Sequence, residues 1–326
     1  MIDSSAVNRV VLQDILPAIS AHRSETSKPF VLGLSGLQGS GKSTWAAALT
    51  NVLNEQPNLN ARTLSLDDLY LDHPQLVALR NSNPGNALLR TRGQPGTHDE
   101  VLAQQFFQSL ERQAEAGDMR ASQKGQAILW PAFDKSLNSG EGGRVPVSEW
   151  EVIPYDQPLH VLIFEGWCLG FQPLSPDAVE DKWRGARLAK ESLSVEDSNR
   201  AISTQTLGDH QLDHLLAIND NLARYCRSFM GPQIFDAFIH LDTKDLHTVY
   251  DWRLGQEAAL RESKGSGMTD KQVIDFVRGY MPAYELYLSR LSAGDFFADT
   301  GNGEKSKVHI RILLDKQRGV SAVERI

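Results

Sequence analysis

A glycine-rich stretch near the N-terminus constrains the fold of this chain more than any other feature. Residues 36–43 read Gly-Leu-Gln-Gly-Ser-Gly-Lys-Ser, which matches the phosphate-binding pattern G-x-x-x-x-G-K-[ST]. The apolar run 29–34 precedes this stretch, and the run 44–49, rich in helix-favouring residues, follows it. A strand, a glycine loop and a helix in this order predict a P-loop nucleotide site inside an α/β fold.

The chemistry of phosphate binding explains why these residue types occur together. The glycines let the backbone turn several N–H groups toward one point, and the following helix adds the positive end of its dipole. We expect Lys42 to reach the β- and γ-phosphates of ATP, and the Ser43 hydroxyl to bind Mg²⁺. The expected nucleotide-binding residues are Gly36, Leu37, Gln38, Gly39, Ser40, Gly41, Lys42, Ser43 and Thr44.

Composition and charge limit the partners of the chain. Its 326 residues are 41% hydrophobic and 23% charged, which is ordinary for a globular protein with a real core. The net charge of −8 argues against nucleic acid as a main partner. An anionic ligand must therefore be held by a local basic pocket.

The sequence also indicates a compartment. The two cysteines, Cys168 and Cys226, cannot form a disulfide framework, which favours a reducing compartment, and we expect a cytoplasmic protein. We expect no signal peptide and no membrane span, because neither an apolar leader nor a run of about 18 apolar residues occurs. The nine histidines form no readable zinc motif. The oligomeric state is left open.

Apolar runs alternate with helical patterns along the chain, which predicts a parallel sheet with helices on both faces. The expected strands are 29–34, 61–66, 159–164, 235–241 and 295–299, and the type of the apolar run 309–314 is left open. The expected helices are 7–19, 99–116, 212–229, 243–262 and 270–291, the last with a kink at Pro282.

The same reading gives a domain organisation. Residues 1–28 form an N-terminal helical segment packed on the core, and residues 29–326 form a single P-loop domain. Residues 72–97 are expected to be a long polar loop with a functional role. Residues 177–208 are expected to be a surface insertion.

Two carboxylates follow expected strands at their carboxyl ends, where parallel sheets bind ligands. Asp67 follows the strand 61–66 and is the expected general base for an acceptor hydroxyl, with Asp68 as the alternative. Glu165 follows the strand 159–164 in a Walker B-like position and is expected to bind Mg²⁺ directly or through water. A strand-end acid can also be a helix cap or a solvated group.

The expected helix 243–262 carries Arg253 and Arg261 on roughly one side. We predict that they close over the phosphates as a lid, with the glycine-rich break 265–267 as its flexible end. The alternative is a solvated helix whose arginines pair with Glu257 and Glu262.

The acceptor pocket is expected in the loops, because four cations lie in glycine- or proline-rich segments of an acidic chain. Arginine suits carboxylates and phosphates, so these cations predict an anionic acceptor. His98 and Asp99 are candidate contacts for acceptor hydroxyls, although Asp99 can equally cap the following helix. A hydrolase is disfavoured by the lack of a G-x-S-x-G elbow. A GTPase is disfavoured because residues 242–245 do not form the guanine motif. The four cations are Arg90, Arg92, Lys135 and Arg144.

Several motifs, taken together, resemble one known family over residues 30–300. The runs are S-L-D-D-L-Y (65–70), R-G-Q-P-G-T-H-D (92–99), F-D-K-S (133–136), F-E-G-W (164–167), V-Y-D-W-R-L (249–254), G-M-T-D (267–270) and Y-M-P-A-Y-E-L-Y (280–287). They are similar to the plant and cyanobacterial type of D-glycerate 3-kinase and to related fungal ATP-dependent kinases. Uridine kinase, phosphoribulokinase and pantothenate kinase are similar more distantly.

The resemblance implies an ATP- and Mg²⁺-dependent kinase acting on a small hydroxyl-bearing metabolite, and it favours D-glycerate, converted to 3-phosphoglycerate, as that metabolite. It places the general base at Asp67, the metal acid at Glu165, and Tyr70 and Asp134 in the acceptor site with the loop residues. The chain departs from the family pattern at Leu69, at 142–144 and in the long polar stretch 182–203. Kinases of nucleosides, pantothenate or sugar phosphates, and a non-catalytic nucleotide-binding protein, remain alternatives.

Overall fold

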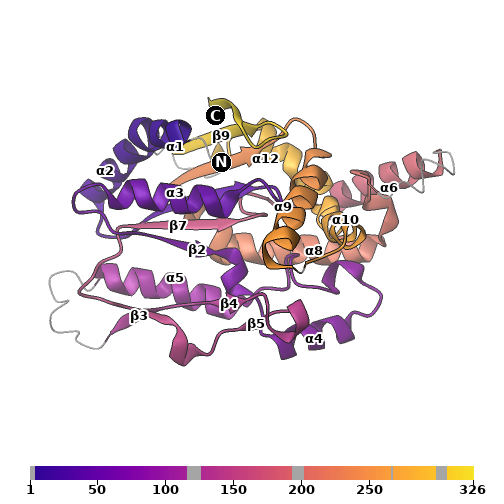
Figure 1. Ribbon diagram of the computed structural model, residues 1–326, viewed down its shortest axis with the longest axis horizontal. Helices are drawn as coiled ribbons and strands as arrows, with labels where there is room; N and C mark the ends of the chain where they lie inside the picture. The colour runs from indigo at the N-terminus through magenta and orange to yellow at the C-terminus, as the bar shows by residue number, and fades with distance from the viewer. Residues whose placement is uncertain (1–3, 116–125, 193–201, 266, 299–306) are drawn as a thin grey trace.

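A six-stranded sheet, in the order β10-β9-β8-β1-β7-β2, forms the centre of the molecule in the computed structural model (Figure 1). The strands from β9 to β2 run parallel, and β10 pairs antiparallel with β9 at the edge. The predicted α/β class with a parallel sheet is confirmed. The strands are β1 (Phe30–Gly36), β2 (Ala61–Ser65), β7 (Val161–Gly166), β8 (Ala237–Asp242), β9 (Val308–Leu314) and β10 (Val320–Arg325). The structure describes residues 4–115, 126–192, 202–265, 267–298 and 307–326.

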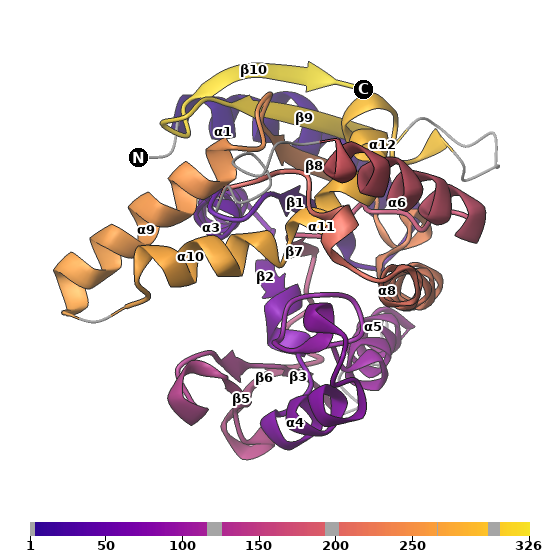
Figure 2. The same ribbon diagram turned by 90° about the vertical axis from the view of Figure 1, so that its right-hand side faces the viewer.

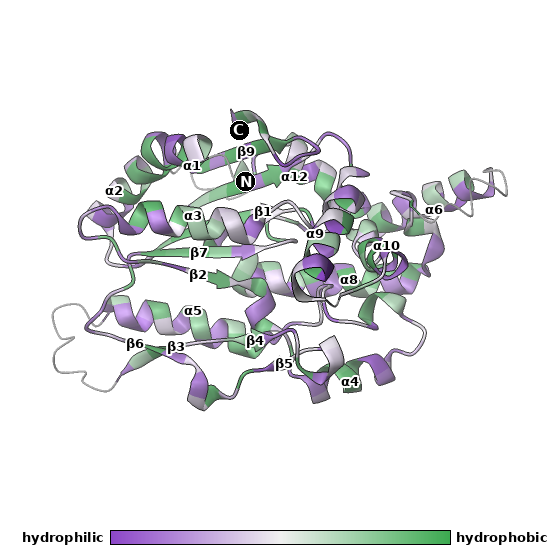
Figure 3. Cartoon of the chain, in the orientation of Figure 1, coloured by the Kyte–Doolittle hydropathy of each residue, from purple (hydrophilic) through white to green (hydrophobic). Residues whose placement is uncertain are grey.

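The central strands are buried on both faces, as expected where helices cover a parallel sheet. Every residue of β1, β7 and β8 is buried. Figure 3 shows these strands as largely hydrophobic, whereas α9 and α10 carry many hydrophilic residues. Gly33 of β1 leaves room for two rings, because a Cβ there would lie 2.4 Å from Phe238 and 2.8 Å from Phe235.

Helices cover the sheet on both sides, with α3 and α8 on opposite sides of β1 and β7 (Figure 2). Helix α3 follows the glycine loop and packs against β1, β2 and β7. Helix α5 lies where 99–116 was expected to be helical, and α8 continues into a π-helical turn. The bounds are α3 (Lys42–Asn54), α5 (Glu100–Glu115), α8 (Leu212–Tyr225) and the π-helical turn Cys226–Met230.

The N-terminal segment is helical, as predicted, but it is longer and contains a π-helical turn. Helix α1 (Ser4–Val10), the π-helical turn Val11–Ile15 and α2 (Leu16–Glu25) follow one another, and α1 contacts α3. Pro17 does not end the helix; it lies at the start of α2, directly after the π-helical turn, and Ile15 and Leu16 before it keep right-handed helical backbone angles.

A smaller lobe lies beside the carboxyl end of β2 (Figure 1). The prediction that 72–97 is a loop is wrong over α4 (His73–Ser82). Asp72 caps this helix in a capping box with Gln75. Two small antiparallel sheets, β3 with β6 and β4 with β5, complete the lobe. Their strands are β3 (Ala127–Trp130), β4 (Phe133–Asp134), β5 (Gly143–Arg144) and β6 (Glu151–Pro154). Short 3₁₀ turns in and around the lobe are Ala87–Leu89, Asn138–Gly140 and Val147–Glu149.

The polar stretch predicted as an insertion is largely one helix. Helix α6 (Pro176–Glu191) is capped by Ser175, buries Val179 and contacts α8. Its polar composition reflects one wide solvent-facing side rather than the lack of an element. Residues 193–201 lie outside the described residues, and a 3₁₀ turn (Leu207–Asp209) follows.

The C-terminal third departs from the sequence prediction at three points. Helix α9 (Thr248–Lys264) begins five residues later than expected, and α10 (Asp270–Arg278) begins at the expected capping box. The break after α10 falls at Gly279 and Tyr280, before Pro282. Residues 295–298 form a turn instead of the expected strand, and residue 299 lies outside the described residues. The strand beside β8 is β9, from the apolar run 309–314. The remaining helical segments are α11 (Met281–Ala283), the π-helical turn Tyr284–Leu288, α12 (Ser289–Ala293) and the 3₁₀ turn Pro232–Ile234.

Candidate functional site

The glycine loop joins β1 to α3 at the carboxyl edge of the sheet, as the motif predicts. Gly39 and Gly41 have left-handed backbone angles, with φ of 80° and 92°, which residues with a Cβ rarely adopt. Gly41 is the N-cap residue of α3, so Lys42 and Ser43 form the first turn of that helix. The loop therefore presents backbone N–H groups and a helix N-terminus at one point, which suits a phosphate.

Lys42 lies folded back onto this loop. Its Nζ donates to the carbonyl oxygen of Leu37 at 3.3 Å. Burial lowers the pKa of Lys42, while the nearby carboxylates of Glu165 and Asp67 oppose that shift. A half-buried ammonium near two carboxylates is suited to neutralising polyphosphate charge.

The end of β7 brings Glu165 to the first turn of α3. The Ser43 hydroxyl donates to Glu165 Oε1 at 3.0 Å, and Glu165 is 5% exposed. A hydroxyl and a carboxylate this close form a hard oxygen donor pair, which fits Mg²⁺. Within the part of the chain that the structure describes, no cluster of three or more His, Cys, Asp or Glu side chains could hold a metal ion. A two-group site fits magnesium, which keeps several water ligands and binds substrate phosphates.

Asp67 and Asp68 follow β2 in a 3₁₀ turn (Leu66–Leu69), and their environments differ. Asp68 accepts the backbone N–H of Ser65 at 3.1 Å in a capping box, and burial raises the pKa of Asp68 to about 6. Burial would also raise the pKa of Asp67, but the Lys135 ammonium, its hydrogen bond and a hydrogen bond from Tyr70 lower it below the ordinary value. Asp67 is therefore charged at neutral pH and can accept a proton.

One cavity of about 200 Å³ brings the strand-end acids and the glycine loop together. Asp67 lies in its wall and Asp68 does not. The Lys135 Nζ lies 2.5 Å from Asp67 Oδ2, so the β4–β5 lobe contributes a cation to the same wall. We call this space the phosphate cavity, and its lining is Gln38, Gly39, Gly41, Lys42, Ser43, Thr44, Asp67, Lys135, Glu165, Gly166, Trp167, Arg253 and Gln256.

The two arginines of α9 lie in different places. Arg253 lines the phosphate cavity, pairs with Glu257 at 3.1 Å and lies over the Phe276 ring at 5.1 Å. Arg261 does not line that cavity; it donates to the Met268 carbonyl and pairs with Asp270 at 2.8 Å. In this structure Arg261 thus ties α9 to α10, while Arg253 lines the phosphate cavity and bonds to Gln256 and Glu257 of its own helix.

His98 is buried and carries an unused donor. The Tyr225 hydroxyl accepts the N–H groups of Gly96 at 2.7 Å and His98 at 3.0 Å, so its own proton is directed to His98 Nδ1 at 3.2 Å. The proton of the neutral ring therefore resides on Nε2, which has no hydrogen-bond partner among the described residues. Burial lowers the pKa of His98 to about 4, so the ring is neutral at pH 7. Its face stacks on Tyr70, with ring centroids 4.4 Å apart.

Most of the other predicted acceptor residues are held by protein partners. Arg144 pairs with Asp99 at 2.8 Å and donates to the Tyr70 carbonyl at 3.0 Å. Asp99 also caps α5 by accepting the N–H of Leu102 at 3.0 Å, the alternative that the sequence had left open.

Arg92, Asp134 and Arg90 are the remaining loop residues that were predicted to form the acceptor pocket. Arg92 donates to the carbonyls of Gly140 at 2.8 Å and Glu141 at 2.6 Å. Asp134 accepts the N–H and the hydroxyl of Ser136. Arg90 and Arg92 line a separate cavity of about 670 Å³ between the 87–94 segment and α10.

Sequence reasoning missed the β9–β10 turn at this site. Arg318 donates to the carbonyls of Gly39 and Trp252, each at 2.7 Å. Tyr284 also reaches the loop, because its hydroxyl accepts the N–H of Gln38 at 3.0 Å. An arginine directly before Gly319 near the C-terminus is a weak turn signal, and nothing local in the sequence relates it to the loop about 280 residues earlier.

No described helix combines the length and apolar content needed to cross a membrane.

Comparisons with known proteins agree on one group of relatives. No protein-family model matches the chain. The uncharacterized kinase mug58 of Schizosaccharomyces pombe is 33% identical over 95% of this chain and 96% of its own length. The chloroplastic D-glycerate 3-kinase of Arabidopsis thaliana is 33% identical over 89% of this chain, which spans 53% of that protein. A solved structure of D-glycerate 3-kinase from Cryptococcus neoformans var. grubii is 32% identical, with a TM-score of 0.79 over 98% of this chain and 99% of that one.

Proposed function

This chain belongs to the kinase family that contains the D-glycerate 3-kinases, and from that premise we propose that it transfers the γ-phosphoryl group of ATP to the 3-hydroxyl of D-glycerate. The observation that carries the proposal is the shared lining of the phosphate cavity by the glycine loop, Glu165 and Asp67. A charged carboxylate beside a phosphate cradle can remove a proton from an acceptor hydroxyl. A protein that only binds nucleotide has no use for such a base.

The transfer follows from the positions of these groups. The acceptor oxygen attacks the γ-phosphorus, the bond from that phosphorus to the β–γ bridging oxygen breaks, and ADP leaves. Asp67 takes the hydroxyl proton. Lys42 and Arg253 line the phosphate cavity, and their positive charges stabilise the negative charge that develops on the transferring group.

Magnesium would be held by the Ser43 hydroxyl and Glu165, whose oxygens lie 3.0 Å apart. When bound, it screens the negative charge of the β- and γ-phosphates. Glu165, at the end of a buried strand, holds the Ser43 hydroxyl in place and keeps a fixed negative charge beside the cradle.

The arrangement of cations favours a small carboxylate as acceptor over a sugar phosphate. Arg144 and Arg92 are held by protein acceptors, so Lys135 is the cation of these loops that lines the phosphate cavity. A single carboxylate needs one such partner, whereas a phosphate monoester generally recruits several. Lys135 would move from Asp67 to the acceptor carboxylate.

The free thiols of Cys168 and Cys226 suit a reducing compartment, and we propose the cytoplasm.

The direct test measures ATP consumption with Mg²⁺ in the presence of single acceptors. The panel contains D-glycerate, L-glycerate, nucleosides, pantothenate and sugar phosphates, and the product is identified by phosphorus and carbon NMR. We expect stimulation by D-glycerate and a phosphate on its third carbon. Stimulation by another compound alone would replace the acceptor, and nucleotide binding without stimulation by any compound would favour a binding protein.

A further inference from the structure

Lys135 reaches the phosphate cavity from the smaller lobe and pairs there with the proposed base. It directly follows β4, and its Nζ lies 2.5 Å from Asp67 Oδ2. Among the described residues, the Asp67 carboxylate is the acceptor that the Lys135 ammonium has. The two side chains are 68 residues apart in the sequence, so their contact depends on how the lobe lies beside the sheet.

This contact occupies the atom through which a base acts. A general base takes a proton through an oxygen that lies within hydrogen-bond reach of the hydroxyl. Asp67 Oδ2 accepts the Lys135 ammonium, and Tyr70 donates a further hydrogen bond to the same carboxylate. Burial raises the pKa of Asp67, but the Lys135 ammonium and these hydrogen bonds bring that pKa below its ordinary value. While the pair is formed, Asp67 is therefore a weak and obstructed base.

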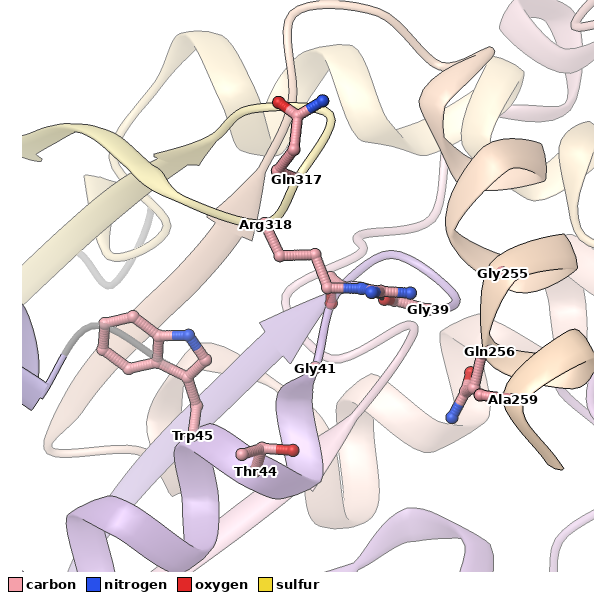
Figure 4. A pocket seen from close by; sticks show the side chains of 10 residues that line it. Gly39, Gly41, Thr44, Trp45, Gly255, Gln256, Ala259, Gln317 and Arg318 are labelled. Carbon is pink, nitrogen blue, oxygen red and sulfur yellow. Dashed lines mark hydrogen bonds between the residues drawn. The ribbon is translucent and has the colours of Figure 1, made fainter. Parts of the chain in front are cut away.

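No other carboxylate in the described part of the phosphate cavity can replace Asp67 as the base. The second carboxylate of its lining is Glu165, which accepts the Ser43 hydroxyl at 3.0 Å. A neighbouring cavity of about 380 Å³ shares Gly39 and Gln256 with the phosphate cavity (Figure 4). The side chains that Figure 4 shows around this second cavity include no carboxylate. Asp67 therefore serves both an acceptor hydroxyl and any water that reaches the γ-phosphate.

Water competes with the acceptor hydroxyl at this site. The Asp67 and Lys135 side chains are 29% and 56% exposed, so water reaches both. If Asp67 takes a proton from water, the water oxygen attacks the γ-phosphorus and the bond from that phosphorus to the β–γ bridging oxygen breaks. ADP and inorganic phosphate then leave, and ATP is consumed without a phosphorylated product. A free base beside MgATP thus favours hydrolysis.

The ion pair can be exchanged for an equivalent one at little cost. Partly exposed ion pairs contribute little net free energy, because water solvates both charges when they separate. A carboxylate on the acceptor can therefore take Lys135 from Asp67, since one ammonium–carboxylate contact replaces another. The flexible four-carbon stem of lysine lets the ammonium move while the lobe stays in place. The exchange leaves Asp67 Oδ2 free when the acceptor hydroxyl arrives.

We propose that Lys135 is the residue that determines acceptor specificity: its ion pair with Asp67 blocks the base, and an acceptor carboxylate that binds Lys135 releases the base. An acceptor must then carry an anion beside its hydroxyl, and water, which carries none, is a poor acceptor. This inference rests on the proposed function, because it takes Asp67 as the base. It adds that the carboxylate of the acceptor controls hydrolysis of ATP by water.

The first experiment uses D-lactate, which has the carboxylate of D-glycerate but no 3-hydroxyl. Bound to Lys135, D-lactate releases Asp67 and leaves room for water where the acceptor hydroxyl would lie. We expect it to raise hydrolysis of MgATP at least tenfold, part of the roughly 10²- to 10⁴-fold that a general base contributes. ADP and inorganic phosphate should form in equal amounts. Glycerol, which has the hydroxyl but no carboxylate, should leave hydrolysis within twofold. D-lactate that competes with D-glycerate without stimulating hydrolysis would overturn the inference.

The second experiment removes the ammonium with K135M, which keeps a similar side-chain length. We expect acceptor-independent hydrolysis to rise at least fivefold, stimulation by D-lactate to disappear, and the KM for D-glycerate to rise at least tenfold. K135R keeps a cation beside Asp67 and should hold hydrolysis within twofold of the unsubstituted protein. K28M, at an exposed ion pair with Glu111 outside the phosphate cavity, is the matched control. The double variant D67N/K135M should hydrolyse ATP as slowly as the unsubstituted protein.

A lysine that only binds the acceptor gives a different result. Its replacement raises the KM for D-glycerate but leaves hydrolysis unchanged, and this outcome refutes the inference whatever D-lactate does. Fast hydrolysis that persists in D67N/K135M refutes it as well, because the water then does not use Asp67.

Product analysis keeps the two proposals apart. If D-glycerate is phosphorylated while K135M hydrolyses ATP no faster than the unsubstituted protein, this inference alone fails. If no acceptor is phosphorylated while K135M hydrolyses ATP faster and D67N/K135M does not, the kinase proposal alone fails.

Discussion

The nucleotide side and the acceptor side of the cavity are built in different ways. On the nucleotide side, the loop, Lys42 and Ser43 come from one continuous segment, and Glu165 joins them across neighbouring strands. On the acceptor side, Arg144 forms an ion pair with Asp99, and Arg92 donates to a backbone carbonyl. These two cations stabilise the loops that carry them, although their position in loops of an acidic protein had suggested that they bind an anion. A phosphate site that is built from backbone N–H groups does not depend on which partner a side chain finds.

The largest effect expected on the nucleotide side follows from removing Lys42. We expect K42A to lower kcat by about 10³-fold, because a positioned charge on the transferring group contributes roughly 10²- to 10³-fold. Steady-state ATP consumption measures it, and K28A, at an exposed ion pair, is the control. A loss smaller than tenfold would mean that the loop binds phosphate without helping its transfer.

The charge on Glu165 can be removed with little change in shape. We expect E165Q to keep the bond from Ser43 but to raise the half-saturating Mg²⁺ concentration by about tenfold or more, since metal-site partners commonly contribute about 10- to 100-fold. The measurement is turnover across a magnesium titration. An unchanged Mg²⁺ dependence would remove Glu165 from the metal site.

Substitutions on the acceptor side should change the stability of the protein, whereas substitutions on the nucleotide side should change the catalytic rate. We expect R144M to lower the free energy of unfolding by about 2 kcal/mol, because it leaves Asp99 partly buried without its partner. The KM for D-glycerate should change less than threefold. Urea unfolding and acceptor titration measure the two quantities. An unchanged stability with a KM raised tenfold would return Arg144 to the acceptor pocket.

A smaller effect concerns the pH dependence of the base. Lys135 helps to lower the pKa of Asp67, so K135M should raise that pKa and move the acid limb of kcat/KM to higher pH. The lowered pKa of Asp67 also determines how the stability of the fold depends on pH. A lowered pKa in the folded state stabilises the fold above the ordinary pKa of aspartate, and this contribution is lost as pH falls through the lowered value. An acid limb that stays in place would show that another group titrates.

Features that depend on residues close together in the sequence were predicted, whereas features that depend on residues far apart in the sequence were not. The loop, the strand-end acids, the capping box at Thr269 and the family resemblance depend on short motifs, and the resemblance and the fold class are confirmed. The helix α4 was missed because its signals, a cap and an early proline, lie in a polar stretch with little apolar periodicity.

Sequence patterns could not predict which side chains pair with each other in the folded protein. The partners of Arg144, Arg92 and Arg318 lie 45, 48 and 279 residues away, so neither composition nor spacing could assign them. The same limit explains why Arg253 and Arg261, which lie on roughly one side of the helix, have different surroundings: Arg261 is held by Asp270, on the next helix.

The most direct test of the central claim replaces Asp67 by asparagine, which keeps the shape and removes the base. The account predicts that D67N binds MgATP within twofold of the unsubstituted protein and that its D-glycerate-dependent turnover falls by about 10²- to 10⁴-fold. D68N should lose stability through its capping box while it keeps turnover. If D67N turns over D-glycerate at the normal rate, Asp67 is not the base and the acceptor side must be assigned anew.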